Sequence, residues 1–232
     1  IVQLCGDAHL LNFGLWATPE RNLSFDLRDF DETLPGPFEW DVARLVASIV
    51  VLARAYGVRA DRAESAVAAC LRAYRERMAG YTSVRWLDIW YDLIAVDQFL
   101  GVFAEPDKIR GAAHIERKAQ KRTHRGAFKK LTEHRDGHLR ITEDPPIRQH
   151  RDDGLAEELF AAYHDSLPYE RRHLLDRFAL VDTVRQVVGV GSVGLRVHLV
   201  LLQGNSLADP LFLQIKQAGP AVYAPWLDTA RY

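Results

Sequence analysis

Hydrophobic residues follow a helical spacing over most of the chain and change to a strand-like alternation near its end. The helical spacing marks residues 41–57, 61–80 and 86–99, and shorter helices are expected at 154–164 and 169–178. After Leu180 the alternation predicts strands at 183–190, 195–203 and 211–217. We therefore expect an α+β fold, with a mainly helical body over residues 1–180 and a small antiparallel β unit over residues 181–232.

Two further strands are expected near the start, at residues 1–5 and 23–27, and each is followed by a polar loop. The first loop reads Gly6-Asp7-Ala8-His9-Leu10-Leu11-Asn12. An Asp placed directly after a strand can accept the proton of a substrate hydroxyl, so Asp7 is a candidate catalytic base, with His9 bracing the loop. Asn12 offers a neutral oxygen to a hard cation such as Mg²⁺. The alternative is a tight turn in which these side chains only satisfy backbone groups.

The second loop, Asp29-Phe30-Asp31-Glu32, carries three carboxylates within four residues. Such a group repels itself unless a cation or an arginine neutralises it. We expect a metal here, with Asp29 as the first ligand and Asp31 as a second. The alternative is a solvated acidic turn, or pairing with Arg28 or Arg44.

A glycine-rich segment, Gly189-Val190-Gly191-Ser192-Val193-Gly194, joins two expected strands. A dinucleotide-binding unit would continue into a helix, whereas the apolar run at 195–202 predicts a strand. Glycines between two strands let backbone N–H groups approach phosphates closely. The nucleotide-binding residues expected are Gly189, Gly191, Ser192, Gly194 and, on the next strand, Lys216. The alternative is a plain hairpin that ends in an exposed lysine.

Composition sets limits on partners and compartment. Lys and Arg number 30 and Asp and Glu 31, so a net charge of −1 gives no general attraction to nucleic acid or anionic membranes. The basic stretch at 108–130 has one aromatic residue, Phe128, and does not favour a surface for single-stranded nucleic acid. No apolar run is long enough to span a bilayer. Two cysteines make no disulfide framework, which favours the cytoplasm. Because the chain begins inside a strand without Met, we expect a fragment.

The long motifs within residues 1–44, 187–194 and 213–216 resemble those of a bacterial family, the domain of unknown function 2252 (DUF2252). The first two loops also resemble, more distantly, those of aminoglycoside and choline phosphotransferases, which have a protein-kinase-like fold. This second resemblance implies that Asp7 is the base, Asn12 and Asp29 the Mg²⁺ ligands, and Asp41 a structural brace. Kinases place the glycine turn and the lysine before the catalytic loops, so a circular permutation would account for the order here.

Together these patterns predict an ATP- and Mg²⁺-dependent phosphotransferase that acts on an unidentified small-molecule or protein acceptor. One alternative keeps the metal for phosphate-ester hydrolysis or nucleotidyl transfer. Another is a catalytically silent, pseudokinase-like binding module.

Overall fold

The computed structural model describes residues 1–20, 22–121, 124–135, 137–151, 154–189 and 194–227. It contains helices and antiparallel sheets, so the predicted α+β class is confirmed. The chain divides into two compact units, Ile1–Ile109 with Ala218–Tyr232, and Arg110–Gln217. This division differs from the expected boundary between residues 180 and 181, which lies inside strand β9 (Ala179–Gln186).

Two antiparallel strand pairs organise the start of the first unit. Its strands are β1 (Val2–Leu4), β2 (Phe13–Ala17), β3 (Leu23–Leu27), β4 (Leu34–Gly36) and β5 (Ile94–Ala95). β1 pairs with β4 and β2 pairs with β3, while β5 adds to the other side of β3. The segment from β1 to β2 and the segment from β3 to β4 are therefore held together at both ends. These two segments are the polar loops predicted from the sequence.

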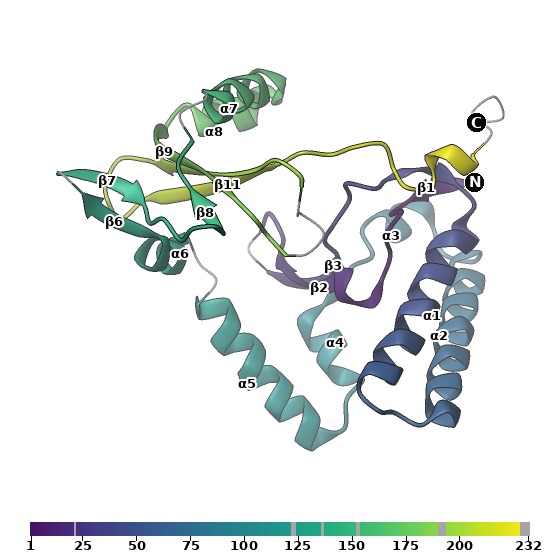
Figure 1. Ribbon diagram of the computed structural model, residues 1–232. Helices are drawn as coiled ribbons and strands as arrows, with labels where there is room; N and C mark the ends of the chain where they lie inside the picture. Colours follow the sequence, from purple (N-terminus) through teal and green to yellow (C-terminus); the bar gives the residue numbers. More distant parts are fainter. Residues whose placement is uncertain (21, 122–123, 136, 152–153, 190–193, 228–232) are drawn as a thin grey trace. The chain divides into compact units, whose positions relative to one another are not determined.

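The helices of the first unit begin directly after β4. They are α1 (Phe38–Ala55), α2 (Ala60–Tyr81), α3 (Trp86–Trp90), α4 (Val96–Gly101) and α5 (Glu105–Lys121), the last of which continues into the second unit. α1 and α2 run side by side (Figure 1). α1 starts at Phe38, three residues before the predicted start, and Gly57, with φ +66°, follows its end as expected. The helix expected over 86–99 is instead two short helices separated by β5.

The last residues of the chain pack against the first strands. Ala221 is buried with Leu4 and Leu34, and Tyr223 and Leu227 lie against the same cluster. A short 3-10 helix, η3 (Ala224–Trp226), follows. Residues 218–227 therefore belong to the core of the first unit rather than to the β unit that the sequence indicated.

The second unit is built on one antiparallel sheet of order β11-β10-β9-β8. Its elements are α6 (His124–Leu131), β6 (Thr132–Arg135), β7 (His138–Ile141), β8 (Arg148–Gln149), α7 (Leu155–Ser166), α8 (Tyr169–Leu175), β9, β10 (Val197–Gln203) and β11 (Pro210–Lys216). The three long strands and both short helices were expected. The β6–β7 hairpin was not.

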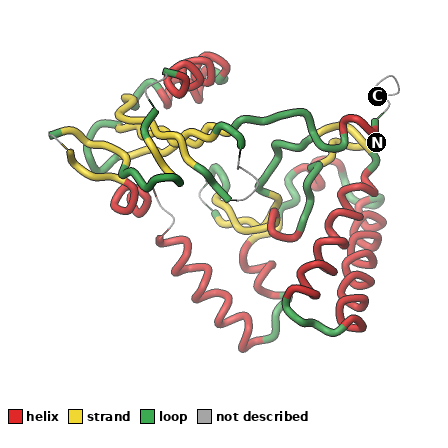
Figure 2. Tube along the Cα trace, viewed as in Figure 1, coloured by secondary structure: helices red, strands yellow, loops and turns green. Residues whose placement is uncertain are grey.

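Alternate residues of β10 are buried against different layers. Leu199 and Leu201 face Ile141 of β7 and a cluster that includes residues of α6. Val200 and Leu202 face Leu175 and a cluster to which α7 contributes. Figure 2 shows α6 and the α7–α8 pair on different sides of these strands. The sheet thus has two buried faces, as its apolar central strand requires.

Candidate functional site

The loop after β1 is fixed in place by α1. The backbone N–H groups of Cys5 and Gly6 donate to the two carboxylate oxygens of Asp41, at 2.7 and 3.0 Å. On the other side of the loop, the Leu10 N–H donates to Ser48 Oγ at 2.9 Å. These bonds satisfy backbone donors that have no strand partner, so they set the path of the loop on both sides of residue 7.

The Asp7 carboxylate is oriented by two basic side chains. Arg44 Nε donates to Asp7 Oδ1 at 2.8 Å, and His9 Nε2 lies 3.5 Å from Asp7 Oδ2. Because the Asp7 and Arg44 side chains are 40% and 37% exposed, this ion pair contributes little stability and chiefly orients the carboxylate. Oδ2 has only the longer contact, to His9, and is the less engaged of the two carboxylate oxygens.

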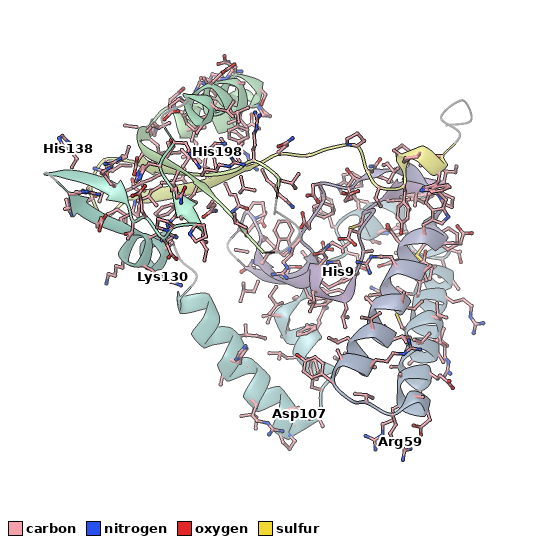
Figure 3. All side chains as sticks on the ribbon, in the orientation of Figure 1. His9, Arg59, Asp107, Lys130, His138 and His198 are labelled. Carbon is pink, nitrogen blue, oxygen red and sulfur yellow. The ribbon has the colours of Figure 1, made fainter. Side chains whose placement is uncertain are left out.

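The His9 ring has a defined tautomer. The Leu11 N–H donates to His9 Nδ1 at 3.1 Å, and this bond caps the 3-10 helix η1 (Leu10–Asn12). Nδ1 must therefore lack a proton, so the neutral ring carries its proton on Nε2, the nitrogen that faces Asp7. His9, labelled in Figure 3, thus lies between the loop backbone and the Asp7 carboxylate.

The side-chain amide of Asn12 also has a determined orientation. Its Nδ2 donates to the backbone oxygen of Asp7 at 2.7 Å. Since a carbonyl can only accept, the nitrogen must face Asp7, and Oδ1 points in the other direction. The backbone oxygen of Asn12 accepts from the Arg28 N–H at 3.0 Å, which connects the first loop to the second.

Carboxylates from both loops and from α1 act on one buried thiol. Cys5 Sγ donates to the backbone oxygen of Asp29 at 3.4 Å. Burial raises the pKa of Cys5 above its ordinary value, and the negative charges of Asp41, Asp7 and Asp29 raise it further. A hydrogen bond with the Asp7 backbone lowers this pKa in part. The candidate base and the candidate metal ligand Asp29 therefore lie close enough to influence the same sulfur. The raised pKa also keeps this thiol protonated, which makes it a poor nucleophile.

The two loops touch at Gly6. This residue has φ +84°, and a Cβ added to it would lie 1.9 Å from the backbone oxygen of Glu32. Only glycine fits there. The Glu32 side chain accepts from the Val222 N–H at 2.6 Å, so this member of the acidic group anchors the C-terminal segment. Asp31 lies in the turn before Glu32 and is not among the charges that act on Cys5.

A metal site can be assessed from these donors. In the part of the chain that the structure describes, no three His, Cys, Asp or Glu side chains form a group able to hold a metal ion. Mg²⁺ is commonly held by one or two protein ligands together with substrate phosphates and water, so a cage of three carboxylates is not required. The Asn12 amide oxygen and the Asp29 carboxylate are hard oxygen donors and fit this pattern.

The glycine-rich segment at 189–194 and Lys216 belong to the second unit. Gly189 and Gly194 have φ +75° and +90°, conformations that favour glycine. Gly191 and Ser192 lie outside the described residues. Lys216 ends β11 opposite Val197 of β10. The loops of Asp7 and Asp29 are in the first unit. That these loops act together with the glycine-rich segment and Lys216 on one nucleotide therefore stays a prediction.

The roles of Arg44 and Ser48 were not predicted from the sequence, although a signal for them exists. Both residues interrupt the apolar run of α1, and with Asp41 they follow an i, i+3, i+7 spacing that puts them on one helix face. Three polar residues on one face of a mainly apolar helix indicate a polar partner, which here is the Asp7 loop.

Comparison with known proteins places the chain in a family. A family described as uncharacterized protein conserved in bacteria (DUF2252) matches residues 1–232. No match was found among curated proteins or solved structures. Within the described ranges, no helix has the length and apolar character needed to cross a membrane. The match spans the whole sequence, and the chain belongs to the DUF2252 family.

Proposed function

We propose that this protein is an ATP- and Mg²⁺-dependent phosphotransferase with a kinase-like active site in a circularly permuted order. One observation carries the proposal. The two strand-bounded loops lie against each other and hold an oriented carboxylate, an oriented amide oxygen and a second carboxylate on a backbone braced by α1. Phosphoryl transfer asks mainly for positioning and charge compensation, which such an arrangement supplies.

Each residue then has a defined task. Asp7 Oδ2 accepts the proton of the acceptor hydroxyl, while Arg44 on Oδ1 and His9 beside Oδ2 hold the carboxylate in place. Asn12 and Asp29 are the residues that hold Mg²⁺, with Asp31 as a further candidate. The bound ion neutralises charge on the nucleotide phosphates.

The nucleotide phosphates are assigned to the glycine turn and the lysine of the second unit. Gly189, Gly191, Ser192 and Gly194 offer backbone N–H groups, and Lys216 offers a compact positive charge. The antiparallel pairing of the strands that flank the turn supports this assignment. The acceptor is a small molecule or a protein.

Nucleotide binding is the first test. Thermal unfolding of the chain is measured with ATP, with and without Mg²⁺, for the wild type, Asp29→Ala and the control Asp26→Ala, which removes an exposed carboxylate of β3. ATP at one hundred times its dissociation constant is expected to stabilise the folded state by about 2.7 kcal/mol. The Mg²⁺-dependent part is expected to be lost in Asp29→Ala and kept in the control. Unchanged binding in Asp29→Ala would sink the metal assignment.

The reaction is tested by its products. A phosphotransferase gives ADP and a phosphorylated acceptor, and Asp7→Asn is expected to keep nucleotide binding while turnover falls by a factor of about 10² or more. Free phosphate as the main product would favour hydrolysis, AMP with pyrophosphate would favour nucleotidyl transfer, and binding without turnover would favour a silent module.

A further inference from the structure

The second unit contains a polar pocket. Its lining includes none of the residues discussed above as catalytic or metal-binding. Its volume is about 320 Å³, and the described residues that line it are Leu155, Arg185, Arg196 and His198. Three of these four carry basic side chains. The pocket lies within Arg110–Gln217, so it can be considered within that unit alone.

Strand register explains why these basic side chains meet. His198 of β10 stands directly opposite Arg185 of β9. Arg196 precedes His198 by two residues, which puts it on the same face, diagonal to Arg185. Lys216 stands opposite Val197 and therefore points to the other face. The pocket is thus on the opposite side of the sheet from the lysine assigned to nucleotide phosphates.

The lining of the pocket combines one buried side chain with two exposed charged side chains. His198 is 3% exposed, on the side of the sheet that α7 and α8 cover (Figure 3), whereas Arg185 and Arg196 are exposed. Leu155 is the first residue of α7, a helix of 12 residues. Backbone N–H groups at a helix start carry partial positive charge and favour an anion.

Among the residues that the structure describes, no carboxylate pairs with the two arginines of this site. Glu157 in the first turn of α7 accepts from Thr183 Oγ1 at 3.0 Å. Two guanidinium groups at diagonal positions of one sheet face repel each other, an arrangement that an anionic ligand would relieve.

We propose that this pocket binds a phosphate group, either as the free anion or as part of a phosphorylated small molecule. Arginine presents several donors in a planar fork that suits phosphate oxygens, and two such side chains provide charge for a dianion. The limited volume and the buried histidine favour a compact group over an extended polymer. Because the two arginines supply the compensating positive charge, this site needs no divalent metal. It lies on the opposite face of the sheet from Lys216, the lysine of the proposed nucleotide site.

Isothermal titration calorimetry tests the proposal on the full chain at constant ionic strength without divalent metal. The probes are sodium phosphate, sodium pyrophosphate and glycerol 3-phosphate. Saturable binding of at least one probe is expected, with affinity reduced about tenfold or more in Arg196→Gln and in Arg185→Gln. Since both arginines are exposed, these variants are expected to fold. The probe that binds most tightly identifies the source as free phosphate, diphosphate or a phosphate ester.

Two controls separate this site from others. Lys130→Gln removes an exposed cation of α6, which packs on the other face of the sheet, and is expected to leave phosphate binding unchanged. Asp29→Ala is also expected to bind normally, so a failure of the kinase proposal would leave this result standing. Absence of binding by all three probes, or equal affinity in the wild type and Arg196→Gln, would overturn the proposal.

Discussion

Replacing Gly6 by alanine tests whether the two candidate loops pack as closely as the geometry indicates. Gly6 has φ +84°, a conformation that costs an L-residue about 1–2 kcal/mol. The new Cβ would also lie 1.9 Å from the Glu32 backbone oxygen, so one of the loops must move. Overpacking of this kind typically costs about 1–3 kcal/mol. The expected loss for Gly6→Ala is therefore about 2–5 kcal/mol.

Gly57→Ala is the matched control. Gly57 also has a positive φ, +66°, but its added Cβ would meet nothing within 4 Å. Its substitution is expected to cost only the backbone strain, about 1–2 kcal/mol. The difference between the two variants isolates the contact between the loops.

Tryptophan fluorescence during urea unfolding is the assay. All five tryptophans lie in the first unit, so the signal reports that unit and not the second. With a denaturant dependence of about 2 kcal/mol per molar urea, the midpoint should fall by roughly 1–2.5 M in Gly6→Ala and roughly 0.5–1 M in Gly57→Ala. Equal midpoints for the two variants would refute the close packing of the loops.

Three further predictions concern single side chains. Asp41→Asn should lower the unfolding free energy, measured by the same fluorescence, by about 1.5–3 kcal/mol. The control Glu39→Gln, in the same helix turn, should lower it by under about 1 kcal/mol. Equal losses would contradict the role of Asp41 in fixing the loop after β1. Hydrogen bonds to Asp176, and to a smaller extent to Asp165, raise the pKa of His164 above its ordinary value of 6.5. The contribution of protonated His164 to the free energy of unfolding should therefore be complete below pH 6.5 and lost as pH rises through the raised pKa. The free energy of unfolding, followed by circular dichroism, should depend less on pH in Asp176→Asn than in the wild type. Cys5, whose pKa is raised, should react with iodoacetamide far more slowly in the folded protein than in urea, as followed by mass spectrometry.

The start of α1 shows where local sequence signals mislead. Apolar residues at helical spacing after Asp41 indicated a helix that begins at this residue. Its carboxylate instead accepts from the backbone of Cys5 and Gly6, and Pro37 occupies the cap position. The brace at Asp41 was implied only by the resemblance to the phosphotransferases, because its partners Cys5 and Gly6 lie 36 and 35 positions away and no local pattern specifies such contacts.

The candidate site could be predicted in its parts but not in its assembly. Alternating apolar residues predicted β3, and the polar loops after it and after β1 followed from composition. The pairing of β1 with β4 joins residues about thirty positions apart, and no local pattern specifies such a pairing. The same reason applies to residues 218–227, whose packing on Leu4 and Leu34 depends on tertiary contacts.

The effect of replacing Asp7 distinguishes the two interpretations of the loop after β1, a catalytic loop and a tight turn. If Asp7 only satisfied local groups, its replacement would destabilise the loop as strongly as the replacement of Asp41. The structure argues otherwise, because the loop backbone is fixed by Asp41 and Ser48, and Asp7 contributes an exposed ion pair worth under about 1 kcal/mol. Moreover, Asn at this position keeps an oxygen for Arg44.

We therefore expect Asp7→Asn to change the fluorescence-monitored unfolding free energy by less than about 1 kcal/mol. Asp41→Asn, measured in parallel, provides the scale of a structural loss. Such a small change would mean that the carboxylate held in one orientation by Arg44 and His9 adds little to stability, as expected for the proposed base. A loss in Asp7→Asn as large as that in Asp41→Asn would instead make the tight turn the better account of this loop, and the base would have to be sought elsewhere.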